Sequence, residues 1–143
     1  MEVKQLMPWA NERHNFYCDK AYFFLESLGI KFEHPTPLYI AKGVNRAGRA
    51  HLKECECEYS LVYLISVKED YEQTIAHEVA HHVVWQLDPN TSTHYAYHGD
   101  MFRFVMTAIF SRPPSTRHSY GYDDAHVVLA KVLLALKELE TVK

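Results

Sequence analysis

The sequence predicts an α+β fold in a single domain that spans residues 1–143. Near both ends of the chain, apolar residues recur at three- and four-residue steps, which is typical of amphipathic helices. Between these regions lie three short strand-like segments joined by short links, a layout that favours a small three-stranded, mainly antiparallel sheet. The expected order is an N-terminal helix, the sheet, a histidine-containing helix and two C-terminal helices.

The composition is typical of an ordinary globular protein, with 48% hydrophobic and 23% charged residues. A formal net charge of -3 gives no general attraction to nucleic acid or to an anionic membrane. The N-terminal residues lack the apolar run of a signal peptide, and no segment reaches the roughly 18 apolar residues of a membrane span. The three cysteines, in a chain without an export signal, favour a reducing compartment. We therefore expect an intracellular, cytoplasmic protein without a membrane partner.

The N-terminal helix is expected over residues 11–28, with Asn11 as its N-cap and Gly29 at its end. Its core-facing stripe is expected to contain Phe16, Tyr17, Ala21, Phe24 and Leu28. Strands are expected over residues 38–42, 47–53 and 59–67. The third strand is almost continuously apolar and should be the most buried. Gly48 is expected to supply a turn or bulge between the first two strands.

Three more helices are expected downstream. The first begins near residue 69 and ends near residue 88, and it is anchored in the core by Ile75, Val79 and Val83. A polar loop follows, and then a helix over residues 101–110 that Pro113 and Pro114 bring to an end. The last helix is expected over residues 123–139.

The most informative motif is His-Glu-x-x-His at residues 77–81. His77 and His81 are four residues apart, so on a helix they share one face and can bind one metal ion. Glu78 places a carboxylate beside them that can act as a base on a metal-bound water. The motif therefore predicts the site of a metal-dependent hydrolase. His82 is rotated by roughly 100° from His81 around the helix. We therefore expect it to contact residues around the metal ligands or in the core, and not the metal ion itself.

A catalytic site of this kind usually has a third protein ligand. Val84 and Leu87 occupy the positions at which the short metzincin spacer would require Gly and His, so that class is excluded. A glutamate from a following helix is also excluded, because no Glu occurs between Glu78 and Glu138. The remaining candidates are His94, His98 and Asp100.

His98 is the favoured third ligand. Gly99 permits close backbone approach, and Phe102 can fix the start of the next helix in the core. HEVAH, followed after sixteen residues by HGDMF, resembles the HExxH…HGxxF pattern of the SprT-like (Spartan-type) zinc metalloproteases, over roughly residues 10–122. The resemblance implies a zincin-like domain that binds one Zn2+ ion through His77, His81 and His98, with Glu78 as the catalytic base.

Many bacterial members of that family end in a four-cysteine zinc ribbon. This chain has no cysteine after Cys57, so we expect the SprT-like domain without the ribbon. A donor for the transition-state oxyanion is usually needed in such a site. The candidates are Tyr95, Tyr97, His118 and Tyr120.

A short cationic run is a candidate surface for docking nucleic acid or a substrate carboxylate. It consists of Lys42, Arg46, Arg49 and Lys53. Acidic residues follow at once and nearly cancel its charge, so a solvated strand edge is the alternative interpretation.

We therefore expect a zinc-dependent metallopeptidase that hydrolyses peptide bonds in a protein or peptide substrate through zinc-bound water activated by Glu78. A narrower hypothesis is that it acts on DNA-associated proteins. The alternative from another class is a non-enzymatic binding module in which the metal site is structural.

Overall fold

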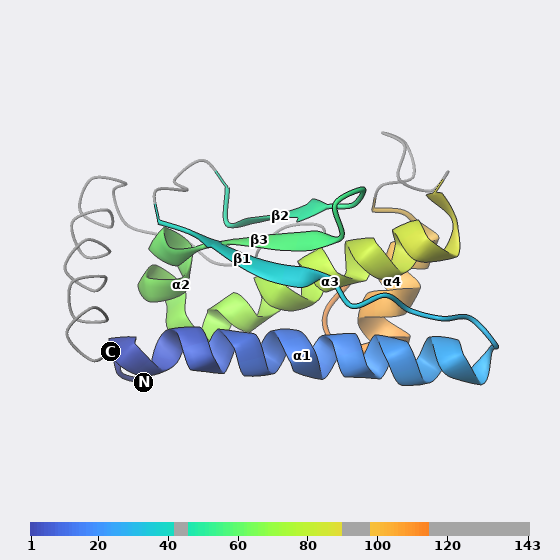
Figure 1. Cartoon of the computed structure of the whole chain (residues 1–143). Coiled ribbons are helices and arrows are strands. Elements are labelled where there is room, and N and C mark those ends of the chain that lie inside the picture. The colour runs from blue at the N-terminus through green and yellow to red at the C-terminus, as the bar shows by residue number, and fades with distance from the viewer. Residues whose placement is uncertain (42–45, 90–97, 115–143) are drawn as a thin grey trace.

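The computed structural model of the chain describes residues 1–41, 46–89 and 98–114 (Figure 1). A long N-terminal helix is followed in these residues by three short strands and a series of helical segments. Their bounds are α1 Val3–Ser27, β1 Thr36–Ile40, β2 Gly48–His51, β3 Glu56–Ser60, α2 Leu61–Val67, the 3-10 helix η1 Lys68–Tyr71, α3 Glu72–Leu87, α4 Asp100–Phe104 and the π-helix η3 Val105–Ile109. The predicted α+β class is confirmed.

Helix α3 occupies the centre of the fold, between α1 and the sheet (Figure 1). Ile75, Val79 and Val83 are fully buried, as predicted. Every residue from Gln73 to Val84 is buried, including those with polar side chains. Because burying a polar group without a partner is costly, the histidines and the glutamate within this stretch need bonding partners or a ligand.

The sheet is mixed, with the strand order β1-β3-β2. Strand β3 pairs in parallel with β1 and antiparallel with β2. The predicted three-stranded sheet is present, but the prediction that it is mainly antiparallel was wrong. The third strand takes the middle position, and its residues Cys57 and Tyr59 are fully buried. This places β2 at one edge of the sheet.

The expected third strand over residues 59–67 was also partly wrong. Only Tyr59 and Ser60 of that segment belong to β3, and the rest forms α2. Ser60 caps this helix, its side chain accepting a hydrogen bond from the Tyr63 N–H at 3.4 Å. All residues from Leu61 to Ile65 are buried. A continuous apolar run satisfies a buried helix as well as a buried strand, so periodicity alone could not distinguish them.

Helix α1 begins eight residues earlier than expected, at Val3. Glu2 and Gln5 form a capping box at its start, and the helix accommodates Pro8. Asn11 is therefore not an N-cap, and its side chain accepts a hydrogen bond from the Tyr39 hydroxyl at 2.5 Å. In the predicted stripe, Tyr17 and Ala21 are buried, whereas the side chains of Phe16 and Leu28 are exposed.

The remaining described helices lie close to the ranges that were predicted from the sequence. Helix α3 is preceded by a 3-10 turn and ends at Leu87, close to the predicted end. The segment expected as one helix over residues 101–110 is formed by α4 and the π-helix, and Ser111 ends it with a φ of 53°. The helix expected over residues 123–139 lies outside the described residues. None of the described helices has the length and apolar character that crossing a membrane requires.

Candidate metal centre

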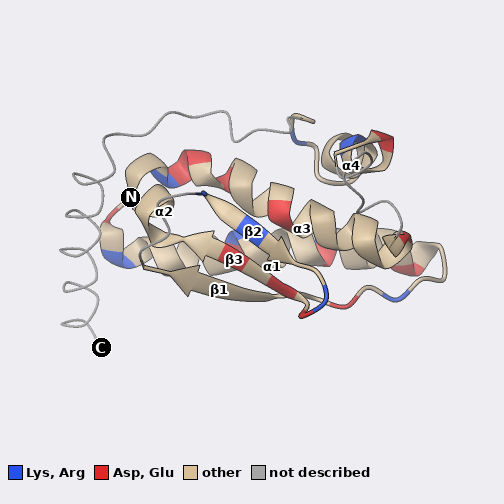
Figure 2. Cartoon of the chain, turned by 90° about the horizontal axis from the view of Figure 1, so that it is seen from above, with Lys and Arg blue, Asp and Glu red and all other residues tan. Residues whose placement is uncertain are grey.

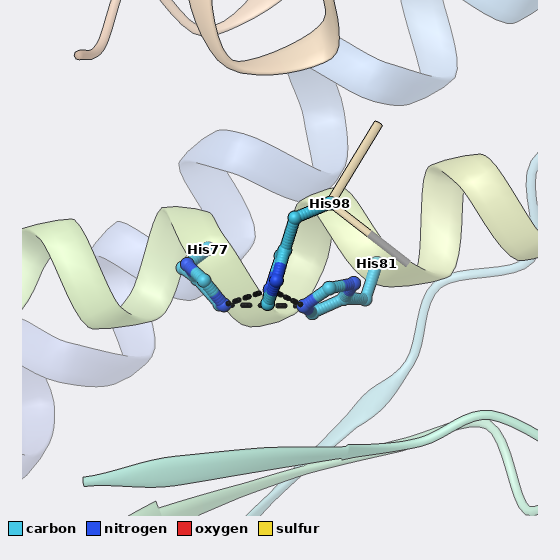
Figure 3. A group of neighbouring side chains, drawn as sticks. All are labelled: His77, His81 and His98. Atoms are coloured by element: carbon cyan, nitrogen blue, oxygen red, sulfur yellow. Dashed lines mark hydrogen bonds between the residues drawn. The ribbon is translucent and has the colours of Figure 1, made fainter. Parts of the chain in front are cut away.

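Three histidine side chains converge next to α3 (Figure 3). His77 and His81 come from adjacent turns of α3, and His98 comes from the residues just before α4. The Nε2 atoms of His77 and His81 are 3.1 Å apart, and His98 Nε2 lies 3.2 Å from His77 Nε2 and 3.1 Å from His81 Nε2. The three nitrogens therefore form a nearly equilateral triangle.

The size of this triangle fits a metal ion. In a tetrahedral site with Zn–N bonds of about 2.0–2.1 Å, two ligand nitrogens lie roughly 3.3 Å apart, close to the separations found here. Ring nitrogens directed at one point bring lone pairs together, and a cation bound there relieves their repulsion. Three nitrogen ligands would also leave one tetrahedral position open to solvent or substrate, as in catalytic zinc sites.

The surroundings of the triad hold the three rings in place. His77 and His81 are buried, and His98 is half-buried. Phe102 from α4 is fully buried and packs against all three, with ring centroids 4.8 to 5.0 Å away. Burial lowers the pKa of His98, which keeps its nitrogen lone pair available to a metal. The predicted role of Phe102 as an anchor is consistent with this packing.

Glu78 is also buried, and its carboxylate reaches the underside of β2, where a Cβ placed on Gly48 would lie 3.0 Å from Glu78 Oε2. The pKa of Glu78 is raised to about 8, chiefly by burial and also by the charge of Glu58, while Arg46 acts in the opposite direction. A carboxyl with this pKa exchanges protons near neutral pH. A cation bound by the triad would favour its ionised form.

His82 has a structural role, in agreement with the sequence. It is fully buried, and its Nε2 atom donates a hydrogen bond to the Glu56 carbonyl oxygen at 2.8 Å. This contact joins α3 to β3, the central strand. Burial lowers the pKa of His82 to about 4, so the ring is neutral at physiological pH.

The other predicted site residues are only partly placed by the structure. The alternative ligand Asp100 is exposed and does not belong to the triad. Arg46, Arg49 and Lys53 are exposed, and Arg49 lies directly opposite Glu58 in the β2–β3 pairing. Figure 2 shows basic and acidic residues side by side on these two strands. The candidates outside the described residues are Lys42, His94, Tyr95, Tyr97, His118 and Tyr120.

Two residues beside the site were not recognised from the sequence. Gly48 is not in a turn or bulge; it is the first residue of β2, paired with Tyr59 and packed over Glu78. Tyr71, just before α3, donates a hydrogen bond from its hydroxyl to the Ala47 carbonyl oxygen. The small residues at positions 47, 48 and 50 were the available signal, because glycine inside a strand often marks a close approach of another group.

Comparison with known proteins places the chain in a family. Residues 41–119 match the SprT-like family. Protein SprT of Pseudomonas putida is 33% identical over 91 residues, which are 63% of this chain and 53% of the relative. Protein SprT of Pseudomonas aeruginosa is 32% identical over 106 residues, or 73% of this chain and 59% of the relative.

The chain thus spans a little over half the length of these curated relatives. No solved structure gives a significant match. The matched residues include the whole triad, Glu78 and Gly48. On the extent of this match, the chain belongs to the SprT-like family.

Proposed function

We propose that this chain is a zinc-dependent metallopeptidase that hydrolyses peptide bonds. The observation that carries the proposal is the convergence of His77, His81 and His98 within 3.2 Å of one another, with Glu78 next to His77 in sequence. The three imidazoles would hold the zinc ion. When bound, zinc lowers the pKa of a coordinated water toward neutrality and polarises a substrate carbonyl.

Glu78 would transfer the protons of the reaction. Its carboxylate would take the proton from the attacking water and give it to the leaving amine as the peptide bond breaks. A pKa of about 8, caused mainly by burial, supports this role, because a group that both accepts and donates a proton works best with a pKa near the working pH. The buried surroundings also limit competition from bulk water.

A peptide is the substrate class that the neighbouring strand suits. Strand β2 is at the edge of the described sheet, and Gly48 brings its backbone over Glu78. An extended peptide could add to this edge through main-chain hydrogen bonds. Such pairing would hold a scissile bond beside the metal centre whatever the side chains of the substrate.

The Glu78→Gln variant tests this proposal against the structural-metal alternative. We expect the variant to retain about one equivalent of zinc, because the three histidines are unchanged, and to lose roughly 10²- to 10⁴-fold in kcat/KM, the usual contribution of a general acid–base. Zinc content and cleavage of casein or an unfolded protein are the measurements. A wild-type protein with a full zinc site that cleaves none of several unfolded substrates would instead support a non-enzymatic module.

Action on DNA-associated proteins stays a prediction. It requires salt-dependent DNA binding that weakens when Arg46 and Arg49 are both changed to Ala. DNA binding that is insensitive to salt and to these substitutions would refute it. Arg49 lies directly opposite Glu58 in the β2–β3 pairing, so an acidic residue on the neighbouring strand faces the cationic run.

A further inference from the structure

The first residue of β2 lies against the proposed general base. A Cβ atom added to Gly48 would lie 3.0 Å from Glu78 Oε2 and 3.1 Å from Glu78 Cγ. It would also lie 3.1 Å from the Glu58 carbonyl oxygen. These separations are shorter than normal contacts between carbon and such atoms, so the glutamate side chain occupies the space that any other residue at position 48 would need.

Glycine is not needed here for its backbone conformation. Gly48 lies in a regular strand, and among the described glycines only Gly29 has a positive φ, of 76°. An alanine could therefore adopt the Gly48 backbone without strain. The requirement for glycine at this position is steric and comes from Glu78 and the neighbouring strand.

The backbone around Gly48 is held firmly. The Ala47 carbonyl oxygen accepts hydrogen bonds from the Tyr71 hydroxyl and from the Ser60 N–H, the latter at 3.1 Å. The Ser60 N–H also donates to the Tyr71 hydroxyl oxygen at 2.9 Å. Gly48 itself is paired with Tyr59 of the central strand. Of the groups that an added Cβ would meet, the Glu78 side chain is therefore the one that can move, whereas the Glu58 carbonyl oxygen is held in the strand pairing.

We propose that Gly48 is a positioning residue, whose missing side chain sets the place of the Glu78 carboxylate beside His77 and His81. The proposal rests on the proposed peptidase function for its catalytic consequence. The steric contact itself depends on neither zinc nor activity. Tyr71 contributes indirectly, because its hydroxyl fixes the carbonyl that precedes Gly48.

The first test compares the kinetics of Gly48→Ala with those of the wild type. We expect kcat to fall about 10-fold, less than the roughly 100-fold cost of misplacing a catalytic group by about 1 Å, because relieving contacts of 3.0 and 3.1 Å moves the Glu78 carboxylate by only a few tenths of an ångström. KM and the zinc content should be unchanged. Gly29→Ala is the matched control: nothing lies within 4 Å of its added Cβ, but its positive φ strains alanine. It should lower stability and leave kcat unchanged. An unchanged kcat in Gly48→Ala would overturn the proposal.

The second test measures thermal unfolding of the zinc-free protein and needs no activity. Gly48→Ala should lower the melting temperature of the wild type and lower it less in the Glu78→Ala background, where both contacts with Glu78 are gone and only that with the Glu58 carbonyl oxygen remains. If Gly48→Ala does not fold, recovery of folding in the double variant supports the contact. Equal losses in both backgrounds, or no recovery of folding, would overturn it. A wild type that cleaves nothing would refute the peptidase while this test still decides whether Gly48 places Glu78.

Discussion

Two sets of buried histidines lie in the same core and differ in what their ring nitrogens face. His14 directs both ring nitrogens at oxygen atoms: Nε2 donates to the Pro35 carbonyl oxygen at 2.7 Å, and Nδ1 accepts from the Tyr59 hydroxyl at 2.6 Å. His82 directs Nε2 at the Glu56 carbonyl oxygen. His77 and His81, only one turn apart on α3, direct theirs at each other and at His98.

The atoms that the ring nitrogens contact distinguish a metal site from structural histidines in a chain that has ten histidines. Nitrogen-to-oxygen bonds satisfy a neutral imidazole, so that ring joins elements of the core and needs no ligand. Three imidazole nitrogens that converge on one point instead match the donor set that binds zinc. His81 and His82 are neighbours in sequence but belong to different sets, because the helix turns by roughly 100° between them.

The role of His82 as a buried, neutral histidine can be tested through the pH dependence of the free energy of unfolding. The pKa of His82 is about 4 in the folded protein and 6.5 for an unperturbed histidine. Between these values the unfolded state binds more protons, so stability is fully present above pH 6.5 and is lost as the pH falls toward 4. The shift corresponds to about 3 kcal/mol.

Urea unfolding of wild type and His82→Gln from pH 7 to pH 4, without metal, measures this effect. Glutamine can still donate to the Glu56 carbonyl but does not titrate. The variant should therefore lose about 3 kcal/mol less than the wild type over this range. Parallel curves would show that His82 is not held neutral by its surroundings.

A smaller effect is expected at the other structural histidine. Tyr59→Phe removes the hydroxyl that donates a hydrogen bond to His14 Nδ1. The buried Nδ1 atom then has no donor. We expect a loss of about 1–3 kcal/mol in the free energy of unfolding, with zinc content unchanged, as measured by chemical denaturation and metal analysis. Loss of zinc in this variant would mean that the two histidine sets are not independent.

Local spacing made the two histidines of α3 predictable from sequence. Their separation by four residues depends only on helix geometry, and the burial of Val79 and Val83 followed from the apolar pattern. Spacing alone could not predict His98, because it comes from a different segment of the chain that folds back against α3. The Gly99 and Phe102 that accompany it supplied that information.

The parts that sequence reasoning missed depend on contacts between distant segments. Every residue from Leu61 to Ile65 is buried, so the apolar character of this segment could not distinguish a helix from a strand. The position of β3 between β1 and β2 depends on long-range strand pairing, which the local sequence pattern does not indicate. The contact between Gly48 and Glu78 joins residues thirty positions apart.

The central claim is that His77, His81 and His98 together hold one zinc ion. Metal analysis of the wild type beside His98→Ala and His82→Gln, after equilibration with limiting free zinc, tests it most directly. We expect about one equivalent of zinc in the wild type and in His82→Gln, and little in His98→Ala, since two remaining histidine ligands bind the ion weakly. Full zinc occupancy in His98→Ala, or loss of zinc in His82→Gln with the fold intact, would contradict it.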